Sequence, residues 1–436
     1  MGSILIRGGR VCDPASGRDE PADVLVRDGK IARVGRVKAK ADEVIDATGK
    51  IVCPGLIDMH VHLREPGNDE AETIASGVSA AVAGGFTAVA AMPNTDPPVD
   101  SVPAVEYVYL QAARARLARA YPIGAITKGR RGEELAELAS LSRAGAVGFS
   151  DDGAPVSNAA LMRRAMEYAA PLGKPVITHA EDLSLSAGGV MHEGAVSTRL
   201  GLAGIPAASE LVAVMRDVIL AEATGAHLHV AHVSVAGPVE VIRQAKARGV
   251  HVTAEVTAHH LTLTDECLLE RDEEGILTFD TNYKMNPPLR TPGDVEALRT
   301  GLRDGTIDCI VSDHAPHTPQ TKAVEFAEAS FGIVGLETTL PLVITELIGT
   351  GCLSWSQAVA ALTVNPARVL GIASGTLSVG SDADITVIDP DREWTIDVKA
   401  FRSRSRNSPF DGRKVKGAAA CVIVGGEVKV GRGRDG

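Results

Sequence analysis

The sequence predicts an α/β protein, a (β/α)8 barrel of the TIM type with a small β-sandwich domain built from both ends of the chain. Between about residues 55 and 370, short apolar runs that end in polar residues alternate with stretches rich in Ala, Leu, Glu and Arg. This alternation is typical of repeated βα units, which form parallel sheets. The 436 residues are 45% hydrophobic and 23% charged, a composition that indicates a globular protein rather than a disordered or fibrous one.

The barrel is predicted from eight apolar runs, each of a length that suits one buried strand. Eight parallel strands with intervening helices fit a (β/α)8 barrel, in which the active site lies at the carboxyl ends of the strands. An open, doubly wound sheet is the main alternative, but no G-x-G-x-x-G follows an early strand. The eight predicted strands are 55–62, 86–94, 120–127, 146–152, 175–179, 226–232, 251–257 and 307–313.

The two ends of the chain predict a second, smaller unit. Residues 1–54 and 375–436 contain short alternating strands, such as ADVLVRDGKIARVG and CVIVGGEVKV, separated by Gly and Asp turns. We expect these two segments to form one β-sandwich beside a barrel of residues 55–374. The basic run FRSRSRNSPFDGRKVKG is short and lacks interleaved aromatics, so we expect a solvated loop rather than a nucleic-acid site.

Charge and cysteine usage exclude several classes of function. Lys and Arg total 44 against 55 Asp and Glu, a net charge of −11, which disfavours nucleic acid and anionic membrane as partners. The six cysteines lie far apart and form no C-x-x-C pair, so we expect buried, reduced thiols. No apolar stretch reaches membrane-spanning length and the start lacks a targeting signal. The expected location is the cytoplasm.

Polar side chains at the ends of the predicted strands point to a metal centre. His60 and His62 lie two apart in the first strand, so both face the same side, where neutral imidazoles bind a divalent metal. His179, His232 and Asp313 end the fifth, sixth and eighth strands, at the same edge of the barrel. The fourth strand adds FSDDG, whose carboxylates could bridge two metals. No partner is predicted for the other histidines: His192, His227, His229, His251, His259, His260 and His314.

These residues lie in motifs that resemble the amidohydrolase superfamily and, more narrowly, the bacterial class I dihydroorotases. The resemblance covers nearly the whole chain. It implies reversible, zinc-dependent interconversion of dihydroorotate and N-carbamoyl-aspartate, the third step of pyrimidine synthesis. The motifs are HVHLREPG (60–67), MPNT (92–95), FSDDG (149–153), THAED (178–182), MNPPLR (285–290), SDHAPH (312–317), SFGIVGLET (330–338) and SRNSPF (405–410).

The resemblance also implies roles for the metal ligands. His60 and His62 would bind a first zinc ion, and His179 and His232 a second. Asp152, chosen over Asp151 by the spacing that the family shows, would bridge the two ions in place of the carboxylated lysine of many members. Asp313 would face the first ion and act as the catalytic base and then acid: it would accept the proton of the attacking water and pass it to the leaving amide nitrogen.

The family's substrate contacts fall on a second group of residues. Arg64, Asn94 and His317 match positions that hold the substrate carboxylate, a role that suits a guanidinium with neutral donors. Asn286 and the backbone at Phe331 and Gly332 match positions that contact the pyrimidine ring. From the residues alone, Arg64 could instead pair with Glu65, Asn94 could cap a helix and Phe331 could belong to the core. The stretch HTPQTKAVEFAEAS, after the eighth strand, is predicted to be a mobile lid.

Two alternatives to this function are open. Another cyclic-amide hydrolase, such as a dihydropyrimidinase, hydantoinase or allantoinase, shares the H-x-H motif and the late aspartate, but usually has the bridging lysine. A non-catalytic scaffold for aspartate transcarbamoylase is the other, although such chains have typically lost metal ligands that are all present here. We expect a homo-oligomer, and the resemblance allows a complex of the active enzyme with aspartate transcarbamoylase.

Overall fold

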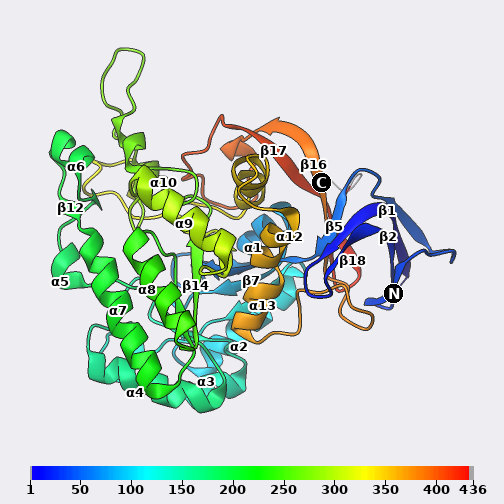
Figure 1. The fold of residues 1–436 in the computed structure, drawn as a ribbon, viewed down its shortest axis with the longest axis horizontal. Helices are drawn as coiled ribbons and strands as arrows, with labels where there is room; N and C mark the ends of the chain where they lie inside the picture. Colours follow the sequence, from blue (N-terminus) through cyan, green and yellow to red (C-terminus); the bar gives the residue numbers. More distant parts are fainter. Residues whose placement is uncertain (1, 432–436) are drawn as a thin grey trace.

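The computed structural model describes residues 2–431 and consists of alternating strands and helices with a sheet at one end (Figure 1). Each of the eight predicted apolar runs contains or overlaps one parallel strand, usually shorter than the run itself, and the third strand begins one residue before its run. The strands are β6 (Leu56–Val61), β7 (Phe86–Ala91), β8 (Arg119–Pro122), β9 (Phe149–Ser150), β10 (Val176–Thr178), β13 (Leu228–Val230), β14 (Val252–Thr257) and β15 (Cys309–Val311). The α/β prediction is confirmed.

The parallel strands pair with their neighbours in chain order. β6, β7 and β8 form one run, and β9, β10, β13, β14 and β15 form another. Single parallel bridges link the two runs at both ends, Gly124 with Phe149 and Val61 with His314. The carboxyl ends of all eight strands therefore meet at one edge.

Helices separate these strands along the chain and pack on their outer side (Figure 1). Helix α9 shows how the sequence sets their limits: Thr291 and Asp294 form a capping box at its start, and Gly305 ends it with a left-handed backbone. The main helices are α1 (Ile74–Ala83), α2 (Val102–Ala115), α3 (Leu138–Ala144), α4 (Ala159–Ala169), α7 (Ala207–Thr224), α8 (Ala236–Ala247), α9 (Pro292–Asp304), α12 (Trp355–Leu362) and α13 (Val364–Leu370).

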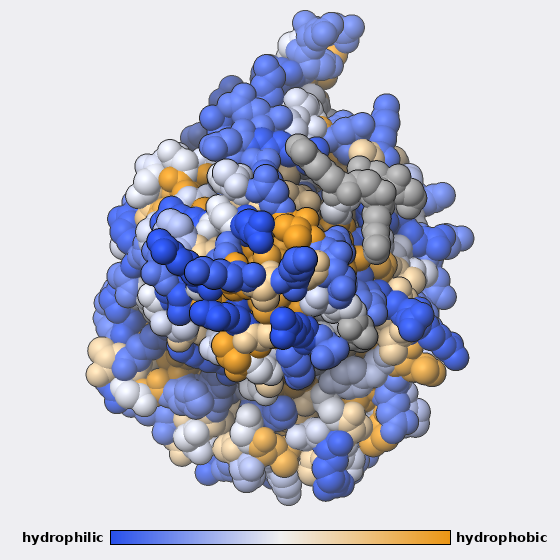
Figure 2. All heavy atoms as spheres, turned by 90° about the vertical axis from the view of Figure 1, so that its right-hand side faces the viewer, coloured by the Kyte–Doolittle hydropathy of each residue, from blue (hydrophilic) through white to orange (hydrophobic). Residues whose placement is uncertain are grey.

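Both ends of the chain contribute to a single eight-stranded sheet, in which β5 pairs with β1 on one side and with β16 on the other. In Figure 1 the blue N-terminal and orange to red C-terminal strands lie side by side. Hydrophilic residues cover most of the face seen in Figure 2, with apolar residues in small patches between them. The strands are β1 (Ser3–Asp13), β2 (Arg18–Arg27), β3 (Lys30–Gly35), β4 (Glu43–Asp46), β5 (Ile51–Pro54), β16 (Ile385–Thr395), β17 (Lys414–Val424) and β18 (Glu427–Val430).

Shorter elements lie in the connections after the parallel strands, and the sequence analysis did not anticipate them. A second apolar cluster, which includes Met285, Phe326 and Phe410, packs these connections against the segment that follows β16. The short elements are α5 (Leu183–Ser186), β11 (Met191–His192), α6 (Ala195–Leu200), β12 (Gly204–Ile205), α10 (Pro319–Lys322), α11 (Thr339–Leu342) and a π-helix (Val343–Ile348).

The cysteines form no disulfide within the described residues. Four of the thiols are buried, and those of Cys267 and Cys352 are partly exposed, so the prediction of buried thiols is wrong for these two. Among residues 2–431 no helix combines the length and the apolar character needed to cross a bilayer.

Candidate active site

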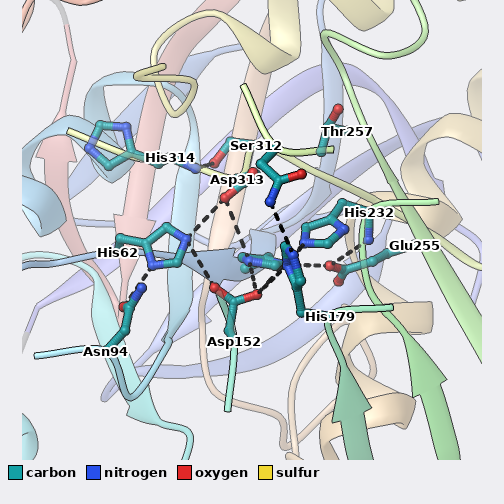
Figure 3. Close-up of polar contacts among 12 residues, drawn as sticks. His62, Asn94, Asp152, His179, His232, Glu255, Thr257, Ser312, Asp313 and His314 are labelled. Carbon is teal, nitrogen blue, oxygen red and sulfur yellow. Dashed lines mark hydrogen bonds and ion pairs between the residues drawn. The ribbon is translucent and has the colours of Figure 1, made fainter. Parts of the chain in front are cut away.

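His60 and His62 lie where β6 ends, and both ring Nε2 atoms face a pair of carboxylates. Figure 3 shows His62 beside these carboxylates, Asp152 and Asp313. The two-residue alternation of the strand puts them on one face, as predicted. His60 Nε2 lies 3.4 Å from an Asp152 oxygen and 3.6 Å from an Asp313 oxygen, and His62 Nε2 lies 3.0 Å from the same Asp313 oxygen. The structure thus brings the H-x-H motif together with carboxylates from β9 and β15.

Asp152 occupies the middle of the site, directly after β9. Its carboxylate lies within 3.7 Å of a ring nitrogen of each of four histidines: His60, His62, His179 and His232. Burial by itself raises the pKa of Asp152, but the positive charge of His60 and the other imidazoles close to the carboxylate hold that pKa well below its ordinary value. The site therefore contains an ionised carboxylate surrounded by nitrogen ligands.

Asp151 points away from this centre. Its carboxylate accepts the backbone N–H groups of Ile126 and Thr127, at 2.8 and 3.1 Å, and a hydrogen bond from the Thr127 hydroxyl. These bonds hold the connection that follows β8 next to the end of β9. Asp152, rather than Asp151, is the strand-four carboxylate that the structure places among the histidines.

His179 and His232 approach from the opposite side, at the ends of β10 and β13. His179 Nδ1 lies 2.9 Å from His232 Nε2, and each of these atoms is within 3.7 Å of Asp152. The other nitrogen of His179, Nε2, donates to Glu181 at 3.0 Å. These two nitrogen atoms are close enough to bind the same metal ion.

Hydrogen bonds on Nδ1 orient both rings of the H-x-H motif. A carboxylate or amide oxygen can only accept, so His60 Nδ1 donates to Glu255 at 2.5 Å and His62 Nδ1 donates to Asn94 at 2.8 Å. In each ring the remaining nitrogen, Nε2, faces the carboxylates at the centre. Such outer partners fix the tautomer of metal-binding histidines.

Glu255 is a functional residue that the sequence analysis missed. It is fully buried on β14, and besides His60 it accepts from His229 Nε2 at 3.1 Å and from the backbone N–H of His232 at 3.3 Å. His229, which had no predicted partner, is thereby explained. The sequence does contain an indication of this role: Glu255 is the one charged residue of the strand VTAEVT, and a buried carboxylate requires a partner.

The donor set fits a divalent metal. His60 Nε2 and Asp152 Oδ1 are buried and have no hydrogen-bond partner within the described part of the chain. Two groups of side chains bring their ligand atoms within 4.8 Å of one another: His60 with Asp152 and His232, and His60 with His62 and Asp313. Imidazole nitrogen with carboxylate oxygen is a combination that suits zinc and neighbouring metals.

The carboxylate-binding candidates lie beside this centre. Arg64 donates to the carbonyl of Pro316 at 3.1 Å, so it does not pair with Glu65, and its guanidinium lies 3.4 Å from the His317 ring. His317 donates from Nε2 to the carbonyl of Phe331 at 2.7 Å. Burial and the nearby charge of Arg64 lower the pKa of His317 to about 3, so its ring is neutral. The side-chain oxygen of Asn94 accepts the hydrogen bond from His62, which leaves the amide N–H groups of Asn94 available to a substrate.

The ring-binding candidates line the same region. Asn286 donates to Glu181 at 2.9 Å, next to His179. Gly332 has a φ of +119°, and a Cβ there would lie 2.6 Å from the Cβ of Ala315, so the position requires glycine. Its N–H donates to the carbonyl of Lys284 at 2.9 Å.

Several known proteins are similar to this chain in sequence. A family model described as "Dihydro-orotase-like" matches residues 49–237. The chain is 57% identical to a dihydroorotase of Pelotomaculum thermopropionicum and 55% identical to one of Syntrophotalea carbinolica, in each case over 98% of both chains. The chain belongs to the dihydroorotase family. It is therefore a cyclic-amide hydrolase of a metal-dependent superfamily.

Solved structures of related hydrolases share the dihydroorotase-family fold seen here. L-Hydantoinase (dihydropyrimidinase) from Arthrobacter aurescens superposes with a TM-score of 0.88 and is 28% identical, with 99% of this chain and 97% of that chain covered. A D-hydantoinase (dihydropyrimidinase) from a Thermus species superposes with a TM-score of 0.80 at 27% identity, over 98% of this chain and 95% of that chain. The shared fold is of the TIM-barrel type.

Proposed function

We propose that this chain is a zinc-dependent dihydroorotase that interconverts dihydroorotate and N-carbamoyl-aspartate in pyrimidine synthesis. The observation that carries the proposal is the convergence of four histidines, Asp152 and Asp313 at one buried centre beside Arg64. Family membership at 57% identity supports the substrate assignment.

The chain's ligand set supports two zinc ions. His60, His62 and Asp313 would hold one ion, His179 and His232 the other, and Asp152 lies between the two sets, where it would bridge them. When bound, zinc lowers the pKa of water and polarises a carbonyl group.

Asp313 is placed to move the proton of the reaction. In the hydrolytic direction, Asp313 takes a proton from the attacking water and delivers it to the ring nitrogen as the amide C–N bond breaks. The same carboxylate thus acts as base and then as acid. Its Oδ1 lies 3.0 Å from His62 Nε2, a contact that keeps the carboxylate at the centre.

The substrate carboxylate is proposed to bind to Arg64, Asn94 and His317. Arg64 supplies a positive charge, and the free amide N–H groups of Asn94 supply neutral donors. Asn286 and the backbone of Phe331 and Gly332 would contact the ring. Substrate binding here would require His317 to redirect the hydrogen bond that it makes with Phe331 in the structure.

The alternative functions have less support. The hydantoinase structures share the fold at 27–28% identity, whereas named dihydroorotases are 55–57% identical over the full chain. An aspartate also stands at the strand-four position where those enzymes usually have lysine. A purely structural role is disfavoured because no proposed metal ligand has been lost.

We further propose the architecture that supports this activity. The ring of eight parallel strands, with its linking bridges, would form the (β/α)8 barrel of residues 55–374. Residues 1–54 and 375–436 would form the smaller β domain. The single sheet that both segments share supports this domain, and residues 432–436 lie outside the described part.

We propose a cytoplasmic homo-oligomer. Association with aspartate transcarbamoylase would be tested by co-elution of the purified proteins, and separate elution at micromolar concentration would contradict a stable complex.

The central test is an ultraviolet assay of purified protein with zinc restored. We expect turnover of dihydroorotate and of N-carbamoyl-aspartate, loss of both activities with a chelator, and recovery when zinc is added. Dihydrouracil, hydantoin and allantoin serve as competing substrates. Efficient opening of one of these, with no action on dihydroorotate, would replace the proposal with the alternative hydrolase.

A further inference from the structure

The segment 401–410, which contains the SRNSPF motif and lies between β16 and β17, has two chemically different faces. Its arginines at positions 402, 404 and 406 are exposed, whereas Ser403, Ser405 and Asn407 are buried. The prediction of a solvated loop therefore holds for the arginines and is wrong for the residues between them. Buried polar side chains require partners, and here those partners belong to the rim of the barrel.

The serines attach the segment to the connection that follows β6. The Ser405 hydroxyl donates to the carbonyl of Ala71 at 2.7 Å, and the Ser403 hydroxyl and the Arg404 N–H donate to Glu72. Glu72 also accepts from His314, the residue after Asp313, at 3.2 Å. A strap from outside the barrel is thus fixed to the rim of the active site.

Asn407 contacts the substrate-binding residues more directly. Its side-chain oxygen accepts the backbone N–H of His317 at 3.1 Å. Its side-chain nitrogen donates to the carbonyl of Gly332 at 3.1 Å and to that of Ala315 at 3.0 Å. One planar amide, 6% exposed, therefore sets the separation between the backbones of His317 and Gly332.

A second group holds Gly332 from another direction. The buried ammonium of Lys322 donates to the carbonyl of Gly332 at 3.1 Å and to those of Ser330 and Thr281 at 3.0 and 2.6 Å. Lys322 fixes the loop that carries Gly332, and Asn407 joins the Gly332 carbonyl to the backbone N–H of His317, beside the bond from His317 Nε2 to Phe331.

We propose that Asn407 is a positioning residue for substrate recognition, which holds His317 and the Gly332 backbone at the spacing that the bound substrate requires. The inference rests on the proposed function, because it takes His317 and Gly332 as substrate contacts. Asn407 makes no hydrogen bond to a proposed metal ligand. Its loss therefore weakens substrate binding more than it slows the chemical step.

The test compares Asn407→Asp and Asn407→Ala with Ser405→Ala in the full-length, zinc-loaded enzyme. Asn407→Asp keeps the acceptor for His317 but directs a carboxylate oxygen at two carbonyls. Ser405→Ala is the matched control: it also removes a buried hydrogen bond of this segment but contacts neither His317 nor Gly332. The measurements are KM and kcat for dihydroorotate, bound zinc, and the melting temperature.

We expect both Asn407 variants to raise KM about tenfold or more, with kcat within about threefold of wild type and zinc content unchanged. Ser405→Ala should keep KM within about twofold of wild type. An unchanged KM in the Asn407 variants, or an equal rise in Ser405→Ala, would overturn the proposal, as would loss of zinc. Should Asn407→Ala not fold, the isosteric Asn407→Asp decides. A wild-type enzyme inactive on dihydroorotate would instead overturn the proposed function, and this inference with it.

Discussion

Glu255 accepts a 2.5 Å hydrogen bond from Nδ1 of His60, and the same oxygen receives the backbone N–H of His232. One buried carboxylate therefore holds the ring of a ligand proposed for the first metal and the backbone of a ligand proposed for the second. Glu255 is itself held by His229, whose Nδ1 lies 2.8 Å from the Thr253 hydroxyl. The orientation of the proposed metal ligands thus depends on buried side chains of β13 and β14.

The first prediction concerns this carboxylate. Glu255→Gln removes the negative charge that supports His60, so zinc affinity should fall about 10- to 100-fold while the fold is kept. Competition with a chromophoric chelator measures the affinity. Glu266→Gln, at an exposed glutamate, is the control. Wild-type zinc affinity in Glu255→Gln would show that Glu255 has no part in holding the metal.

The second prediction separates proton transfer from metal binding. Asp313→Asn keeps the volume of the side chain and leaves the other proposed ligands in place. We expect most of the zinc to remain bound while kcat falls by about 10³-fold, because general acid–base catalysis contributes about 10²–10⁴. Metal analysis and steady-state kinetics on the same sample test this. Near-normal turnover would exclude Asp313 as the proton-transfer group.

The third prediction concerns stability and pH. Burial raises the pKa of Glu337 to about 7, although its carboxylate accepts the N–H groups of Arg402 and Ser403. The folded state therefore holds this proton more tightly than the unfolded chain, whose glutamate pKa is about 4.3. The resulting stabilisation is complete below about pH 4.3 and is lost as the pH rises through about 7.

Replacement of Glu337 by Gln isolates this effect. Relative to wild type, Glu337→Gln should gain up to about 3 kcal/mol in free energy of unfolding between pH 5 and pH 8. Urea unfolding of both proteins at the two pH values, under the same metal conditions, measures the difference. A difference that does not change with pH would contradict the raised pKa.

The fourth prediction uses two glycines with left-handed backbones. Gly332→Ala adds a Cβ 2.6 Å from Ala315, whereas at Gly305, with a φ of +80°, the Cβ would meet nothing within 4 Å. Gly305→Ala should cost about 1 kcal/mol of stability from strain alone, and Gly332→Ala should cost more and also raise KM. Thermal unfolding and kinetics of the two variants test this. Equal effects would mean that the contact with Ala315 is relieved without consequence.

Much of the fold could be predicted because it depends on local patterns. Parallel strands covered on both faces are continuous apolar runs, and a parallel strand lies within or overlaps each of the eight runs. The strand limits were less predictable: the run 146–152 contains only the two-residue strand β9, because pairing with neighbours, not apolar character, defines a strand. The same reasoning expected a sandwich from the ends of the chain, where the structure shows one eight-stranded sheet.

The sequence by itself determined which chemical groups stand at the strand ends: His60, His62, His179, His232 and Asp313, each at a polar end of an apolar run. The family resemblance favours Asp152 over Asp151, and only the tertiary structure shows the physical difference: the Asp152 carboxylate faces the histidines, whereas that of Asp151 accepts backbone N–H groups. It also revealed Glu255 and Asn407, whose partners lie 195 residues away at His60 and 92 residues away at Ala315. Periodicity reports which side of its own strand a residue faces. It does not report which distant segment packs there, and hydrogen bonds form only where that packing brings donor and acceptor within about 3 Å.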